Sequence, residues 1–142
     1  MTTNKARKMF GSTWLALGVF AVSLTASAED VKVTLTGAEE VPAVTTKAMG
    51  EGTIAIGKDM SVSGTVKTTG VEGIAAHIHH AEAGKNGPPV ITLIKGEGGA
   101  WSTPPGAKLT EEQYKAFKAG NLYVNVHSAA HKGGEIRGQL KP

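Results

Sequence analysis

Short segments in which apolar and polar residues alternate are the feature that most restricts the fold of this chain. In residues 31–36, the side chains of Val31, Val33 and Leu35 fall on one side, as expected of a strand with one buried face. Residues 122–127 alternate in the same way. Further strands are predicted at 52–56, 60–67, 74–80, 90–94 and 135–140.

Glycine and proline separate these segments, and the chain has nineteen glycines. Residues 57–59 are a short turn that predicts a hairpin between the strands on either side. Residues 84–89 and 96–106 are predicted to be loops, because glycine and proline do not suit a central strand. Short, closely spaced strands predict an all-β fold, an antiparallel Greek-key-like β-sandwich or barrel.

One short helix is predicted at about 109–119. Thr110 and Gln113 have the spacing of a capping box, in which the two side chains satisfy free backbone N–H groups at a helix start. Gly120 stands where a glycine often ends a helix.

The first 28 residues have the order of a secretory signal peptide. A basic start is followed by an apolar run too short to span a bilayer and by the small residues Ala26-Ser27-Ala28. We therefore expect cleavage after Ala28, one domain at residues 29–142, no membrane span in the mature chain, and a periplasmic or secreted location.

Charge and cysteine content narrow the functional classes. Three of the fifteen basic residues lie in the predicted leader, so the mature chain balances twelve basic against twelve acidic residues. This balance gives no indication of nucleic-acid binding. The chain has no cysteine, so a metal site must use histidine, carboxylate or methionine. The sequence leaves the oligomeric state open, a homodimer included.

All five histidines lie between positions 77 and 131. His77 and His79 are two residues apart on a predicted strand, so they project from one face, and His80 is turned away. His127 ends another predicted strand, and His131 follows in a loop. We predict that His77, His79, His127 and His131 bind one metal ion; the alternative is a solvent-exposed set of histidines.

A site made only of imidazole favours copper, and zinc is the less favoured alternative. Glu135 and Arg137 share a strand face close to His131. They would orient an imidazole or attract an anion, or else form an ordinary cross-strand ion pair.

Four stretches resemble the CHRD family, the chordin-type domain found alone in many exported bacterial proteins. They are LTGAEEVPAV (35–44), AAHIHHAEAGKNGPP (75–89), LTEEQYKAFKAG (109–120) and LYVNVHSAAHKGGEIRGQL (122–140). The resemblance implies a Greek-key-like β-sandwich. More distantly, the site is similar to that of copper-zinc superoxide dismutases, whose H-x-H and V-H strands bind copper.

Carried over by position, that similarity implies copper binding by His77, His79 and His127, and guidance of superoxide by Arg137. The zinc loop and the disulfide of those enzymes are absent, so a copper-only centre is implied. The sequence thus predicts a redox-active copper protein with superoxide dismutase-like activity. Two alternatives stay open: a periplasmic copper-binding or storage protein without turnover, and a metal-free protein-interaction module.

Overall fold

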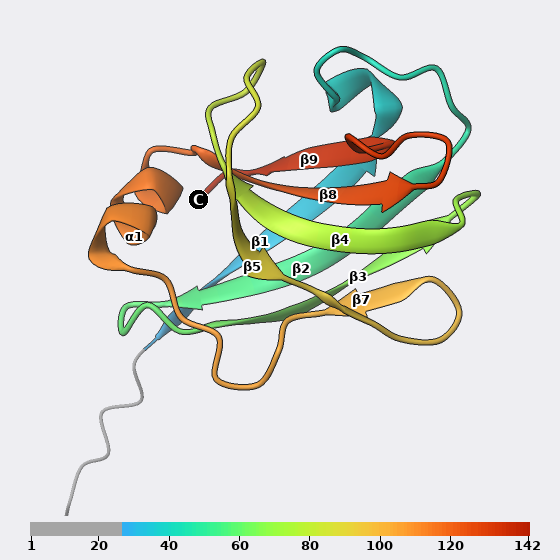
Figure 1. Cartoon of the computed structure of the whole chain (residues 1–142). Helices are drawn as coiled ribbons and strands as arrows, with labels where there is room; N and C mark the ends of the chain where they lie inside the picture. Colours follow the sequence, from blue (N-terminus) through green and yellow to red (C-terminus); the bar gives the residue numbers. More distant parts are fainter. Residues whose placement is uncertain (1–26) are drawn as a thin grey trace, which may run out of the picture.

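The computed structural model describes residues 27–142, so the predicted leader lies almost wholly outside the described residues. In this range the chain forms nine strands, one α-helix and one 3-10 turn (Figure 1). Their bounds are β1 Ala28–Thr36, η1 Gly37–Glu39, β2 Met49–Gly57, β3 Val62–Thr69, β4 Gly73–His80, β5 Pro89–Thr92, β6 Ile94–Lys95, β7 Ala100–Ser102, α1 Glu111–Lys118, β8 Leu122–Ser128 and β9 Ile136–Leu140. None of the helices in residues 27–142 is long and apolar enough to span a membrane.

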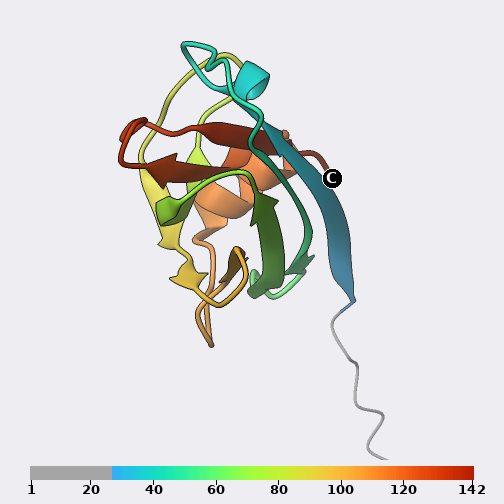
Figure 2. The ribbon, with the colours of Figure 1, turned by 90° about the vertical axis from the view of Figure 1, so that its right-hand side faces the viewer.

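The strands described form one antiparallel sheet in the order β5-β4-β8-β9-β1-β2-β3-β7-β6. The sheet curls into a nearly closed barrel, as Figure 2 shows. The predicted all-β antiparallel fold with one short helix is confirmed, in the barrel form. The predicted hairpin also forms, since β2 and β3 pair from Ile56–Val62 to Met49–Thr69.

The core fills the inside of this barrel. Val33 and Leu35 of β1, Ile54 of β2, Val66 of β3 and Ile78 of β4 are all at most 4% exposed. They come from alternate positions of their strands, as the sequence pattern predicted. Burial of these side chains is the main stabilising contribution, at about 1.5 to 3 kcal/mol for each.

Helix α1 lies at one end of the barrel (Figure 1) and buries Phe117 there. Its predicted capping box is present, because Gln113 N donates to Thr110 Oγ1 and Thr110 N donates to Gln113 Oε1. Gly120 has a positive φ of 77°, the left-handed conformation that suits glycine after a helix.

Two predictions about residues 90–106 are wrong in detail. The single strand predicted at 90–94 is divided at Leu93 into β5 and β6, which are the two edges of the sheet. The chain thus passes directly from one edge to the other and nearly closes the barrel. The loop predicted at 96–106 contains β7, whose Trp101 is 3% exposed and pairs with Val66. Tertiary packing of one tryptophan outweighs the glycine-rich composition around it.

Candidate metal centre

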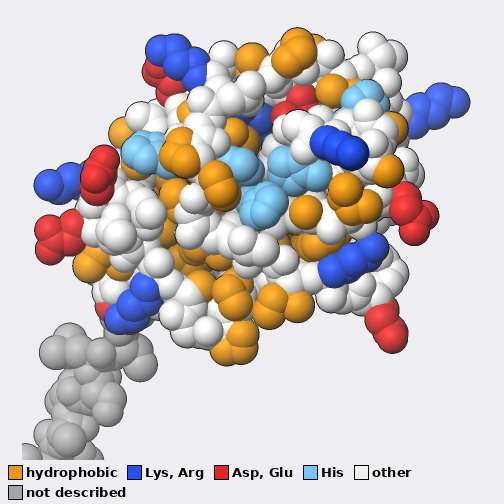
Figure 3. All heavy atoms as spheres, in the orientation of Figure 1, with side chains coloured by type: hydrophobic (Ala, Val, Ile, Leu, Met, Phe, Trp, Pro, Cys, Tyr) orange, Lys and Arg blue, Asp and Glu red, His pale blue; other side chains and the backbone are white. Residues whose placement is uncertain are grey.

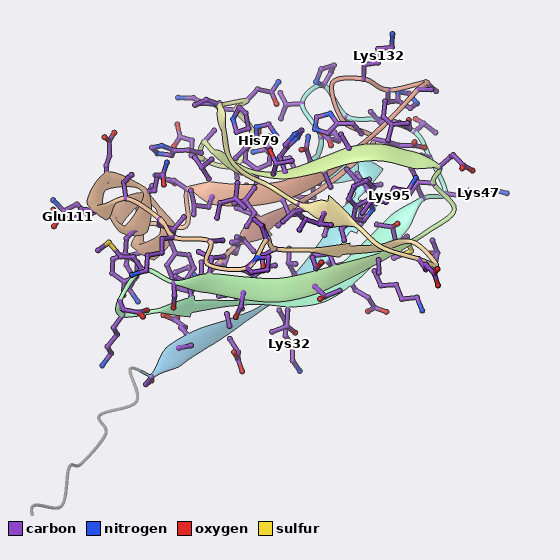
Figure 4. All side chains as sticks on the ribbon, turned by 60° about the horizontal axis from the view of Figure 1, so that its bottom comes forward. Lys32, Lys47, His79, Lys95, Glu111 and Lys132 are labelled. Carbon is purple, nitrogen blue, oxygen red and sulfur yellow. The ribbon has the colours of Figure 1, made fainter. Side chains whose placement is uncertain are left out.

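Strands β4 and β8 place the histidines by their register. Ala75 pairs with His127, His77 with Asn125, and His79 with Tyr123. Paired residues of an antiparallel sheet project from the same face, so these side chains share the outer face, opposite the core. We call the outward set His77, His79, Tyr123, Asn125, His127 and Arg137 the polar face. Figure 4 shows His79 on the side of β4 away from β2 and β3.

Three of the predicted ligands come together. His77, His79 and His127, here called the histidine cluster, each offer one ring nitrogen, and these atoms lie within 4.8 Å of one another. His77 Nδ1 and His127 Nε2 are 3.0 Å apart. A metal ion bound by imidazole sits about 2 Å from each nitrogen, so one ion at the centre of the cluster is compatible with this spacing.

Backbone carbonyls fix the tautomers of two of these rings. His79 Nδ1 lies 2.8 Å from the Gly87 oxygen, and His127 Nδ1 lies 2.8 Å from the Lys132 oxygen. A carbonyl only accepts hydrogen bonds, so both Nδ1 atoms carry the hydrogen and both Nε2 atoms keep their lone pairs. His79 Nε2 is buried and has no hydrogen-bond partner. A ring that donates from one nitrogen and leaves the other free is the usual arrangement of a histidine that binds metal.

Two rings of the cluster, His77 and His79, favour the neutral form. Burial, followed by the neighbouring His127 and His79, lowers the pKa of His77. Burial is also the main cause of the lowered pKa of His79, against an opposing hydrogen bond to Gly87. Because the hydrogen of His127 is on Nδ1, facing the Lys132 carbonyl, its Nε2 accepts the hydrogen bond from His77 Nδ1. Metal ions bind the neutral form of imidazole, so the lowered pKa values of His77 and His79 suit a cation site.

The loop of residues 81–88 covers His79 and is fixed by strands β8 and β9. Arg137 is 1% exposed; its guanidinium donates to the Lys85 oxygen at 2.8 Å and to the Glu82 oxygen at 3.1 Å. It also lies 3.4 Å from the centre of the Tyr123 ring. Gln139 donates to the Ala81 oxygen at 2.8 Å. These contacts hold the loop, and so the Gly87 carbonyl, against the cluster.

Gly87 and Tyr123 bring the same loop close to His79. A side chain at Gly87 would collide with the His80 carbonyl, so only glycine lets the loop approach β4 there. Gly87 N donates to the Tyr123 hydroxyl at 3.2 Å. The Tyr123 ring stacks on His79, with centroids 4.9 Å apart and planes 5° from parallel. The ring orientation of His79 is therefore set by both its neighbours and its hydrogen bond.

A buried carboxyl lies behind the cluster. Glu40 is 5% exposed, and Asn125 Nδ2 donates to its Oε1 at 3.4 Å. Burial raises the pKa of Glu40 to about 7, although Asn125 and the charge of Arg137 oppose that change. Gly134, with a φ of 125°, leaves the space, because a side chain there would collide with Glu40 Oε1.

The remaining predicted residues lie at different distances from this chemistry. His131 is outside the cluster: its backbone forms a tight turn with Ser128 through two hydrogen bonds of 3.2 Å, and its role as a ligand stays a prediction. His80 pairs with Leu122 and is not in the cluster either. Guidance of an anion by Arg137 stays a prediction. In the structure its guanidinium donates hydrogen bonds to backbone carbonyls of the 81–88 loop. Glu135 accepts from Thr46 Oγ1 at 2.8 Å and, within the described residues, forms no ion pair with Arg137.

Some of this arrangement has no signal in the sequence. Any residue has a carbonyl, so the roles of Gly87 and Lys132 follow only from the fold. Alternation along residues 122–127 puts Tyr123 and Asn125 on the same face as His127, but nothing in the sequence indicates their contacts. In the space-filling view, histidine side chains gather in the middle of one face, so small solutes reach this region from solution (Figure 3). His77 and His127 are partly exposed.

Comparison with known proteins agrees with the fold and covers nearly all of the described chain. The model of the CHRD domain family matches residues 31–140. No curated protein and no solved structure matches.

Proposed function

The chain belongs to the CHRD domain family, and we propose that it is an exported metal-binding protein whose centre is one copper ion. The ligands in this proposal are His77 Nδ1, His79 Nε2 and His127 Nε2. His131, on the neighbouring loop, is a further candidate ligand that would have to turn towards the cluster. Export rests on the leader predicted from the sequence.

The observation that carries the proposal is the free, buried Nε2 of His79 inside a group of three ring nitrogens. A buried acceptor without a partner costs about 1 to 3 kcal/mol, and a bound cation removes this cost. The proton between His77 and His127 lies where the cation would bind. On binding, His77 would change tautomer: Nδ1 gives up its hydrogen to water and Nε2 takes one from water, so the ring stays neutral.

Copper is the proposed ion because the cluster offers only nitrogen ligands from histidine. Affinity of such sites for divalent first-row metals is greatest for Cu²⁺, and zinc is the closest competitor. The Gly87 and Lys132 carbonyls support the proposal further, since they make the Nε2 atoms of His79 and His127 better donors.

Superoxide dismutation is the proposed activity of this centre, with copper supplying the one-electron chemistry when bound. The residues of the chain contribute access and charge. His77 and His127 are partly exposed, so a small anion reaches them. Burial is the main cause of the lowered pKa of His79, and the positive charge of Arg137 lowers it further. The same charge would attract an anion to the cluster.

Copper titration of the purified metal-free protein, followed by electron paramagnetic resonance, tests the metal proposal. The expected result is one Cu²⁺ per chain with nitrogen ligands, lost in His77→Ala and in His127→Ala. His80→Ala is the matched control, because His80 is on the same strand outside the cluster. Binding that is not stoichiometric, or that ignores both substitutions, would leave a metal-free interaction module as the better description.

A superoxide assay of the copper-loaded protein then tests the activity. Turnover above that of an equal concentration of free copper supports dismutation, and its loss in Arg137→Leu but not in Arg137→Lys supports guidance by that charge. Stoichiometric copper without turnover would show a copper-binding or storage protein instead.

A further inference from the structure

Two buried side-chain atoms in the described residues have no hydrogen-bond partner, His79 Nε2 and Asn125 Oδ1. Both belong to the polar face. His79 Nε2 is a ligand in the proposed metal centre, whereas Asn125 Oδ1 has no role in it so far. Unpartnered buried polar atoms are rare in folded proteins, so two in one place call for a physical reason.

Asn125 occupies the middle of the histidine cluster. It is the direct cross-strand partner of His77, and the next pair along the two strands is His79 with Tyr123. His127 is two residues further along β8, on the same face. Each of the three histidines is therefore a nearest neighbour of Asn125 on the sheet. The asparagine is 2% exposed, so water does not replace the missing partner of its oxygen from outside.

The amide has one orientation. Its nitrogen donates to Glu40 Oε1 and to the Gly133 oxygen, both at 3.4 Å. Two acceptors on that side require the NH₂ group there, so the oxygen points the other way.

The Asn125 oxygen and the free His79 Nε2 are thus two acceptors in one buried place. Two lone pairs do not satisfy each other, and a cation that binds both does.

We propose that the side-chain oxygen of Asn125 is a fourth ligand of the metal centre, which then has three nitrogen donors and one oxygen donor. This inference rests on the proposed function and adds a residue to the ligand set. Glu40 and Gly133 hold the amide so that its oxygen faces the ion. An amide oxygen is a hard donor, so it favours Cu²⁺ over Cu⁺ and lowers the tendency of the bound copper to be reduced.

Exchange of two functional groups tests the proposal with little change in shape. In the double variant Glu40→Gln with Asn125→Asp, the carboxylate moves to the ligand position, and the glutamine amide donates where Asn125 donated before. Net charge stays the same. Asn125→Leu removes the oxygen and keeps a similar volume. Asn121→Asp is the charge control, because Asn121 lies just before β8, four residues from Asn125. Glu40→Gln alone isolates the first change.

Calorimetry with Cu²⁺ and electron paramagnetic resonance of each loaded protein are the measurements, after circular dichroism has shown that each variant folds. We expect the double variant to bind about tenfold more tightly and Asn125→Leu to bind about tenfold more weakly than wild type. The parallel g value should shift in both variants, while coupling to three nitrogens persists. Asn121→Asp should match wild type.

The outcomes separate this inference from the proposal on which it rests. Stoichiometric copper in wild type, with an affinity and a spectrum that are the same in Asn125→Leu and in the double variant, would overturn the role of Asn125 alone. A wild-type protein that binds no copper would overturn the metal centre itself and the ligand role of Asn125 with it.

Discussion

The two faces of strands β4 and β8 are packed with different kinds of side chain, although the same two segments of the chain form both. Inward, Ala76, Ile78, Val124 and Val126 are at most 1% exposed and pack into the barrel core. Outward, the polar face is also largely buried, with Tyr123 and Asn125 at 2%. Aliphatic side chains exclude water from the inner face. On the outer face, imidazole and phenol rings, an amide and the Arg137 guanidinium do so.

The comparison shows which face tolerates substitution more readily. Apolar packing is non-directional, so the inner face needs only the right volume and shape. The outer face needs donors opposite acceptors at each buried polar group. Its hydrogen bonds reach Gly87, Lys132, Lys85 and Glu82, all of them backbone carbonyls outside β4 and β8. The unpartnered atoms of His79 and Asn125 depart from this rule, and the proposed metal centre would account for both.

The largest effect is expected on the inner face, where Ile78→Ala leaves a cavity in the core. We expect the free energy of unfolding of the metal-free protein to fall by about 3 to 4 kcal/mol in urea denaturation. Copper stoichiometry should stay at one in the folded fraction, since Ile78 does not reach the outer face. A fall in the free energy of unfolding of less than about 1 kcal/mol would mean that the inner face contributes less to stability than its burial indicates.

On the polar face, Arg137→Leu should cost about 2 to 3 kcal/mol, because it leaves the Lys85 and Glu82 carbonyls without their donor. Copper affinity should fall about tenfold through the loosened 81–88 loop, with a changed electron paramagnetic resonance spectrum. Arg137→Lys keeps the positive charge but loses the pair of hydrogen bonds to the Lys85 and Glu82 carbonyls. If the lysine variant restored the wild-type spectrum, charge rather than the loop contacts would explain the effect.

Glu40→Gln should stabilise the metal-free protein, with a dependence on pH that identifies the group. The pKa of Glu40 rises from 4.5 to about 7 on folding, so the folded state binds more protons between those values, and wild type loses stability as pH rises through them. Glutamine does not titrate. We expect the variant to be more stable than wild type by about 2 kcal/mol at pH 8 and equal to it near pH 4.

Thermal or urea unfolding of both proteins at a series of pH values makes this comparison. The histidines have the opposite sign: the lowered pKa values of His77 and His79 mean that acid below about pH 6.5 destabilises the fold in both proteins. Their contribution cancels when wild type and variant are compared at one pH. A difference that did not grow with pH would show that Glu40 is not a buried carboxyl.

The smallest effect is expected at His131, next to the polar face but outside the histidine cluster. His131→Ala should change copper affinity by less than about threefold, because the backbone turn with Ser128 holds the residue apart from the other three. Calorimetric titration beside His127→Ala makes the contrast. An equal loss in the two variants would establish His131 as a ligand and confirm the four-histidine site predicted from the sequence.

Local patterns predicted much of the structure. Alternation located β1 and β8 to within three residues at each end, and Thr110 with Gln113 gave the start of α1. The spacing of His77 and His79 placed both on one face. The strand β7 was missed, because three residues around Trp101 form a strand only through their pairing with β3 and β6. The division at Leu93 likewise depends on where the two sheet edges meet.

The sequence by itself determined which side chains lie on which face, because alternation along a strand is a local property of the backbone. It also determined the chemistry available, since a chain without cysteine that carries five histidines offers imidazole to a metal. Only the tertiary structure decided the rest. The pairing of β4 with β8 set three rings around Asn125, and the path of the 81–88 loop set the free nitrogen of His79. Those contacts join residues far apart in the chain, and no local pattern encodes their distance.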